Sequence, residues 1–180
     1  MTRDQAAELA RAAGFSHWGV FPANELVFLP EVREMCAADK CGRYDKNWSC
    51  PPACGTLEEC EKRAGAYDWG VLLQTTAEME DDFDVEAMME ADRLHRERFS
   101  AFLARLGPET DRLPLGAGSC AVCDICTWPD APCRFPGRMT PSMEAYGLQV
   151  SDVCRSAGIA YYYGPRTITY TCCVLFPEEP

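Results

Sequence analysis

The chain has 180 residues, 47% of them hydrophobic and 25% charged, which excludes a disordered polypeptide and is typical of a globular domain. Its 28 acidic residues outnumber the 17 basic ones and give a net charge of −11, so we expect no nucleic acid and no anionic membrane as a partner. The N-terminal segment lacks the apolar stretch of a secretory signal, and no run of about eighteen apolar residues could span a membrane. We therefore expect a soluble, cytoplasmic protein.

Two short helices are predicted by capping boxes. Thr2 with Gln5 begins a helix that Gly14 is placed to end, and Thr56 with Glu59 begins another that runs to about residue 64. Hydrophobic periodicity and apolar runs supply the other elements. These are strands over 17–21 and 69–75, a helix over 85–106, a short helix over 151–157, and β-rich runs over 159–163 and 167–176.

Two details of these elements can be checked against a structure. The two β-rich runs are separated by Gly164-Pro165-Arg166, which predicts a hairpin. In the long helix, Met88 and Met89 fit the helical apolar spacing, which predicts that both fill the core.

The order of the elements indicates an α+β fold. We expect a mixed β-sheet with flanking helices and two cysteine-rich cluster-binding loops, at about 36–60 and 120–133. All of this is expected to form a single domain over residues 1–180.

Twelve cysteines are the most unusual feature of the composition. Structural disulfides are rare in the cytoplasm, so arrays of cysteine there indicate metal or catalytic sites. Residues 120–133 read CAVCDICTWPDAPC, which contains the tight array C-x2-C-x2-C. Zinc is usually held by two separated pairs of ligands, whereas this array begins the ligand run of bacterial ferredoxins. We therefore expect Cys120, Cys123, Cys126 and Cys133 to hold one [4Fe–4S] cluster.

The fourth cysteine of this loop departs from the ferredoxin pattern. Cys133 follows Cys126 after six residues instead of three, and no proline comes directly after it. In ferredoxins with two clusters, the fourth cysteine of a run serves the other cluster, and the same exchange stays open for Cys133.

A second group of five cysteines lies within 25 residues and has irregular spacing. Cys36, Cys41 and Cys50 are expected ligands of a second [4Fe–4S] cluster, and the fourth ligand is either Cys54 or Cys60. The other cysteines, Cys154, Cys172 and Cys173, lack ligand spacing and are expected in the core. Neither histidine, His17 or His95, has ligand spacing, and both are expected to be structural or surface residues.

Several stretches of the sequence resemble motifs of an uncharacterised prokaryotic family of predicted metal-binding proteins. They are WSCPP at 48–52, GTLEEC at 55–60, CAVCDIC at 120–126, PCRFP at 132–136 and PSMEAYG at 141–147. The resemblance runs from about residue 30 to the C-terminus and implies a cysteine-ligated metal protein with iron–sulfur centres, common in anaerobes. The opening stretch AELARAAGFSHWGVFPA is also similar to the start of epoxyqueuosine reductases and reductive dehalogenases, which are corrinoid-dependent iron–sulfur enzymes.

The chain contains no phosphate loop, no G-x-G-x-x-G and no H-E-x-x-H motif, so hydrolytic and nucleotide-dependent chemistry are not indicated. Three functional hypotheses remain. The first is an electron-transfer protein with two [4Fe–4S] clusters that serves a redox partner protein, which the acidic charge predicts to be basic. The second is an iron–sulfur oxidoreductase, a small reductase that acts on a bound substrate, flavin or corrinoid. The third is a zinc-binding interaction module. A pocket beside a cluster would favour the enzyme.

Overall fold

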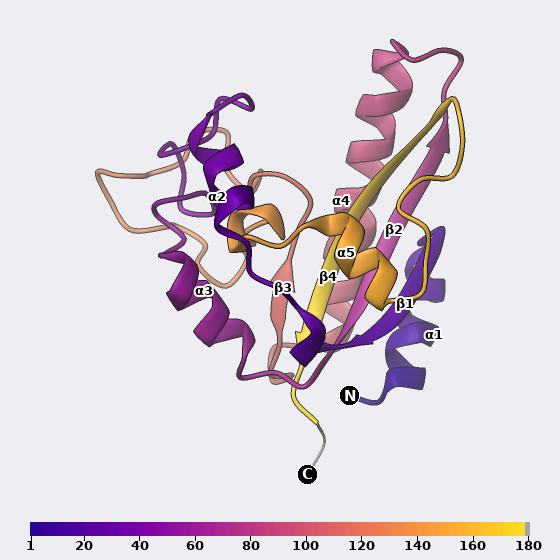
Figure 1. Ribbon diagram of the computed structural model, residues 1–180, viewed down its shortest axis with the longest axis horizontal. Coiled ribbons are helices and arrows are strands. Elements are labelled where there is room, and N and C mark those ends of the chain that lie inside the picture. Colours follow the sequence, from indigo (N-terminus) through magenta and orange to yellow (C-terminus); the bar gives the residue numbers. More distant parts are fainter. Residues whose placement is uncertain (179–180) are drawn as a thin grey trace.

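The computed structural model describes residues 1–178, which form a four-stranded sheet with helices on both faces (Figure 1). The strands are β1 (His17–Pro22), β2 (Trp69–Glu78), β3 (Leu113–Leu115) and β4 (Thr167–Phe176), in the order β1-β2-β4-β3. All pairs of these strands are antiparallel. An isolated bridge between Gly116 and Ser142 is parallel. The expected α+β fold with flanking helices is confirmed.

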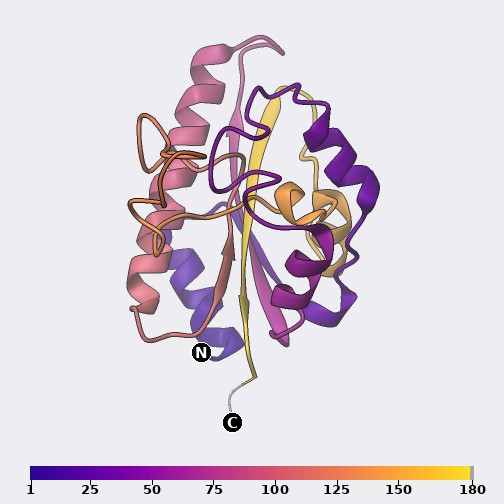
Figure 2. The same ribbon diagram turned by 90° about the vertical axis from the view of Figure 1, so that its left-hand side faces the viewer.

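The helices divide between the two faces of the sheet. They are α1 (Arg3–Ala13), α2 (Pro30–Ala37), α3 (Leu57–Ala64), α4 (Val85–Leu106) and α5 (Val150–Ser156), with 3-10 helices η1 (Ala23–Glu25) and η2 (Glu144–Tyr146). Figure 2 shows α1 and α4 on one side of the sheet and α2, α3 and α5 on the other. Each face therefore has its own hydrophobic core.

The alternation of side chains along β2 and β4 supplies both cores. Leu72 and Cys173 pack on the face of α3 and α5, whereas Leu73 and Cys172 pack on the face of α1 and α4. Both cysteines are fully buried, and Cys154 on α5 is 1% exposed. The prediction that these cysteines fill the core is confirmed.

The two predicted capping boxes are present. The Thr2 hydroxyl accepts from the N–H of Gln5, the Gln5 side chain accepts from the N–H of Thr2, and Thr56 with Glu59 repeats the arrangement at α3. Gly14 ends α1 in the left-handed conformation at φ 85°. Local sequence therefore determines where these helices begin.

The predicted hairpin is wrong. No strand forms over 159–163, and β4 pairs with β2 along its whole length, from Trp69↔Phe176 to Glu78↔Thr167. The aromatic side chains of the segment have other surroundings: Tyr161 and Tyr162 are exposed, and Tyr163 stacks on His17 and donates to Gln74 Oε1. Since β-propensity mainly reflects packing, a run of tyrosines without a neighbouring strand stays irregular.

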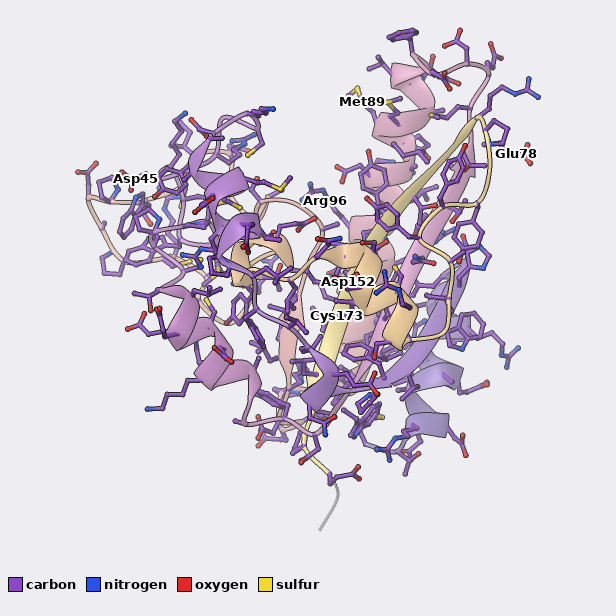
Figure 3. All side chains as sticks on the ribbon, viewed as in Figure 1. Asp45, Glu78, Met89, Arg96, Asp152 and Cys173 are labelled. Carbon is purple, nitrogen blue, oxygen red and sulfur yellow. The ribbon has the colours of Figure 1, made fainter. Side chains whose placement is uncertain are left out.

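The prediction for the methionine pair is wrong for Met89, whose surface is 68% exposed. The buried stripe of α4 runs through Ala91, His95, Phe99, Phe102 and Leu106. Met88 precedes this stripe by one turn and is half-buried, whereas Met89 lies one position off it and points away from the sheet (Figure 3).

Gly19 allows α5 to approach β1 closely. A Cβ atom at this position would lie 2.2 Å from the carbonyl oxygen of Ala157, the residue that ends α5. Replacing Gly19 with alanine is expected to lower the free energy of unfolding by about 3 kcal/mol, because the backbone must shift to remove the overlap. Denaturant unfolding measures this change. Gly137→Ala is the matched control, since no heavy atom would lie within 4 Å of its Cβ. Equal stability of both variants would contradict the prediction.

Candidate metal centre

The two cysteine-rich segments lie side by side at one end of the molecule, away from α1 (Figure 1). The Nε1 of Trp48 donates to the carbonyl oxygen of Ala131 at 3.2 Å, and the Nε1 of Trp128 donates to Asp45 Oδ1 at 2.9 Å. The two indole rings also meet edge to face, with centroids 4.7 Å apart. Asp45 marks the outer end of this region in Figure 3. Two segments separated by about sixty residues of sequence thus form one surface region.

The four cysteines of the second segment line one small cavity. Cys120, Cys123, Cys126 and Cys133 are all half-buried around a space of about 20 Å³. Its other lining residues are Asn47, Trp48, Ser49, Val122, Phe135 and Met139. The structure therefore brings together the four thiols that the sequence predicts as one ligand set. No carboxylate or imidazole shares this lining, so the four thiols are its main metal-binding groups, and they are soft sulfur donors.

Ser49 joins the two segments and was not among the residues predicted from the sequence. Its hydroxyl is fully buried, accepts from the N–H of Cys120 at 2.9 Å and lies 2.5 Å from Asn47 Oδ1, to which it donates. The Sγ of Cys50 is 4.0 Å from the same hydroxyl. One serine therefore contacts a cysteine of each group. Its place before Cys50 in WSCPP was the only available indication in the sequence.

Three cysteines of the first segment form an open group. Cys41 is exposed, and Cys36 and Cys50 are half-buried. Burial raises the pKa of the Cys36 thiol, and Glu144 and the thiols of Cys50 and Cys41 raise it further. Burial also raises the pKa of Cys50, although hydrogen bonds from Asn47 and Ser49 oppose this change. The thiol of Cys41 also raises the pKa of Cys50, so the three thiols lie close enough to interact electrostatically.

Cys54 and Cys60 lie deeper and close to each other. Cys54 is 5% exposed and Cys60 is fully buried on α3. The hydrogen bond with Cys54 lowers the pKa of Cys60, and the guanidinium groups of Arg63 and Arg33 lower it further. Arg63 Nη2 is 3.3 Å and Arg33 Nη1 is 3.7 Å from the Cys60 sulfur. The two arginines supply positive charge here, and spacing in the sequence did not indicate them.

The PSMEAYG segment at 141–147 packs beneath the first cysteine group. The carbonyl oxygen of Glu144 is 3.8 Å from the Sγ of Cys36, and that of Ala145 is 3.7 Å from the Sγ of Cys54. Ala145 also accepts from Arg33 Nη1 at 2.7 Å. The segment thus supports both the thiols and the arginine that lies beside them.

Neither cysteine group converges on a point. Within residues 1–178, no three histidine, cysteine, aspartate or glutamate side chains lie close enough together to hold a single metal ion. The cavity among the second group has room for about one water molecule. The donor set fits a thiolate-bound centre, and a multi-atom centre is larger than the present cavity.

Two other features bear on function. Both histidines lie outside the cysteine groups: His17 is half-buried in β1, and His95 is 1% exposed on α4. In the part of the chain that the structure describes, no helix combines the length and apolar character needed to cross a membrane.

Comparison with known proteins gives a family match. The model of a family described as "Predicted metal-binding protein (DUF2284)" matches residues 19–176, which is most of the chain. No curated protein and no solved structure matches. The matched range contains both cysteine groups and all four strands except the first two residues of β1.

Proposed function

This chain belongs to the family of predicted metal-binding proteins, and from that membership we propose that it carries two [4Fe–4S] clusters and transfers electrons to a partner. The observation that carries the proposal is the gathering of Cys120, Cys123, Cys126 and Cys133 around one cavity that no carboxylate or imidazole lines. Bound clusters of this kind supply one-electron transfer. The chain's own residues hold the clusters, limit their access to water and set the surrounding charge.

The first cysteine group is proposed to hold the other cluster through Cys36, Cys41, Cys50 and Cys54. The thiols of the first three affect one another's pKa. The pKa of Cys54 is raised mainly by its hydrogen bond with Cys60 and by burial, and the Cys50 thiol adds a smaller effect in the same direction. Cys60 is the open alternative for the fourth position. In this arrangement, Arg33 and Arg63 offset the negative charge of the thiolates, which raises the reduction potential of a bound cluster.

The contacts between the two segments support transfer between the two centres. Ser49 touches Cys50 on one side and binds the N–H of Cys120 on the other. Trp48 and Trp128 cover the junction with their rings. These contacts connect a cysteine of one group with a cysteine of the other, which supports electron transfer between the two proposed clusters.

The test is a metal and sulfide count on anaerobically purified protein. We expect about eight irons and eight acid-labile sulfides per chain, which is the content of two cubanes, and an electron paramagnetic resonance signal after reduction. Stoichiometric zinc without sulfide, in protein made under iron-replete and oxygen-free conditions, would contradict the proposal and favour the zinc-binding interaction module. Four irons per chain would limit it to one centre.

The partner is proposed to be a basic redox protein. The net charge is −11, and each [4Fe–4S]²⁺ cluster with four thiolates adds about two negative charges. Such a field steers a positively charged partner, and it is screened over about 8 Å at physiological ionic strength. The second-order rate of electron transfer to a basic acceptor is expected to fall at least ten-fold between low and physiological salt. A neutral small-molecule acceptor is the control, and equal salt dependence with both acceptors would contradict a steering role.

A second candidate function, an iron–sulfur oxidoreductase, is favoured by one observation. A cavity of about 870 Å³ borders Ser119, Cys120 and Ala121 at the start of the second cysteine loop. Binding sites for small molecules have volumes of about 300–1,000 Å³. In this alternative, a substrate in the cavity exchanges electrons with the cluster that Cys120 helps to hold.

A further inference from the structure

The large cavity lies between α4 and two other segments, 116–122, which includes the start of the second cysteine loop, and 136–140, which follows that loop. Arg96 projects from α4 toward this region (Figure 3), and its Nη1 donates to the carbonyl oxygen of Ser119 at 3.2 Å. Phe99 and Leu103 continue the helix wall, and Val122 and Met139 contribute apolar surface from the loop segments. The lining combines apolar walls with several polar groups, as in sites for small molecules.

The cavity has more positive charge than the rest of the chain. Three arginines line it, Arg96, Arg112 and Arg138, against the two acids Glu109 and Asp111. Asp92 pairs with Arg96 at 2.8 Å. Within residues 1–178, Arg112 and Arg138 make no salt bridge: Arg112 donates to the carbonyl oxygens of Gly107 and Thr110, and Arg138 lies over the ring of Phe135. Two guanidinium groups at the cavity thus lack a negative partner in an acidic protein.

His95 belongs to the residues around the cavity and carries an unsatisfied polar atom that is covered by its neighbours. Its side chain is almost fully buried, and its Nδ1 lies 3.1 Å from Thr75 Oγ1. Its Nε2 is the only buried side-chain nitrogen or oxygen of the described residues without a hydrogen-bond partner. Burial lowers the pKa of His95 to about 4, so the ring is neutral at pH 7. Buried polar atoms are nearly always hydrogen-bonded, so Nε2 is a position where a ligand can gain a partner once it displaces the side chains that cover this atom.

We propose that this cavity binds a small organic anion, which is held by Arg112 and Arg138, packs on Phe99 and Leu103, and forms a hydrogen bond with Nε2 of His95. The two guanidinium groups determine the preference for negative charge, because hydrogen bonds between ionised groups are about twice as strong as neutral ones. The inference deepens the oxidoreductase alternative and rests on it for the use of the ligand. Binding itself requires no metal chemistry.

The position of the cavity gives the anion a route to the cysteine loop. Cys120 lines both the large cavity and the small one among the four thiols. A molecule in the large cavity is therefore separated from the proposed cluster only by Cys120 and its neighbours. This placement suits a substrate or effector of the cluster proposed in the second cysteine loop more than a molecule that acts on the first cysteine group.

The charge preference can be measured with 2-naphthoate and its neutral isostere 2-naphthamide. Equilibrium dialysis against the full-length, anaerobically purified chain is expected to show one site that binds naphthoate at least ten-fold more tightly than naphthamide. In the double variant Arg112→Gln/Arg138→Gln, naphthoate affinity is expected to fall at least ten-fold, while naphthamide affinity stays unchanged. Arg155→Gln is the matched control, because its side chain is exposed on α5 and lies outside the cavity.

The role of His95 is tested by a pair of amide substitutions. Glutamine retains a polar group near the position of Nε2, whereas asparagine retains only the one near Nδ1 that faces Thr75. We expect His95→Asn to weaken naphthoate binding about ten-fold and His95→Gln to preserve it. Thermal unfolding confirms that each variant is folded.

Three results would overturn the inference. They are the absence of naphthoate binding at millimolar concentration, equal affinity for the two probes, and unchanged naphthoate affinity in the double arginine variant. The iron and sulfide count is independent of these results. A protein with eight irons that fails to bind naphthoate therefore loses the anion site and keeps its clusters, whereas a zinc-loaded protein that binds naphthoate loses the clusters and keeps the site.

Discussion

Replacing Cys123 with serine is expected to remove about four of the eight irons, because the loop then lacks the middle ligand of its C-x2-C-x2-C array. A hydroxyl is a poor substitute for a thiolate toward iron in a cluster. Cys123 is half-buried and shares its cavity with the other three cysteines of the loop, so no cysteine of the first group lies in the same lining to replace it. Iron and sulfide analysis measures the loss, and the reduced protein should keep the resonance signal of one cluster.

Cys172→Ser is the matched control for this experiment. Cys172 is fully buried in the sheet, where its sulfur lies 3.8 Å from the carbonyl oxygen of Leu73, an acceptor that a serine hydroxyl can also use. This variant is expected to keep all eight irons even if its stability falls. Loss of four irons from Cys172→Ser, or full retention in Cys123→Ser, would show that the ligand assignment is wrong.

The elements that could be predicted from the sequence are those with local causes. The capping boxes of α1 and α3 involve residues three positions apart, so their sequence is sufficient to indicate where the helices begin. The continuous apolar run of β2 likewise indicates a strand buried on both faces. In each case, the physical cause lies within a few residues of its effect.

The wrong hairpin prediction concerns partners distant in sequence. The hairpin was inferred from two adjacent β-rich runs, but β4 pairs with β2, which begins nearly one hundred residues earlier. Nothing local to residues 159–163 indicates that Tyr163 packs on His17 and Gln74 and that the segment forms no strand. Contacts between a loop and a distant strand form only when the whole chain has folded.

The same distinction applies to the candidate site. Cysteine spacing alone predicted which four thiols of the second loop lie together. It did not indicate Ser49, which links the two loops, or Arg33, which reaches Cys60 from α2. Serine and arginine are common on protein surfaces, so only their positions in the folded chain distinguish these two residues.

The sequence left the fourth ligand of the first centre open between Cys54 and Cys60, and the geometry of the two residues favours one of them. Cys54 follows Cys50 by one turn, and the N–H of Cys54 donates to the carbonyl oxygen of Cys50 at 3.1 Å. Cys60 lies behind Cys54, fully buried in the core beneath α3, with its sulfur directed at two guanidinium groups. The order from the open group inward is therefore Cys50, Cys54 and Cys60, which favours Cys54 as the ligand.

Cys54→Ser is accordingly expected to lose about four irons, and Cys60→Ser is expected to retain all eight. The serine hydroxyl at position 60 can still accept from Arg63, so the surroundings of the first cluster stay hydrogen-bonded and the iron content is unaffected. The two variants are controls for each other, because both place a hydroxyl in the same buried region beside the same arginines. Iron loss confined to Cys60→Ser would identify Cys60 as the ligand and Cys54 as its neighbour. Retention of all eight irons in both variants would mean that the two thiols are interchangeable, since either lies close enough to replace the other.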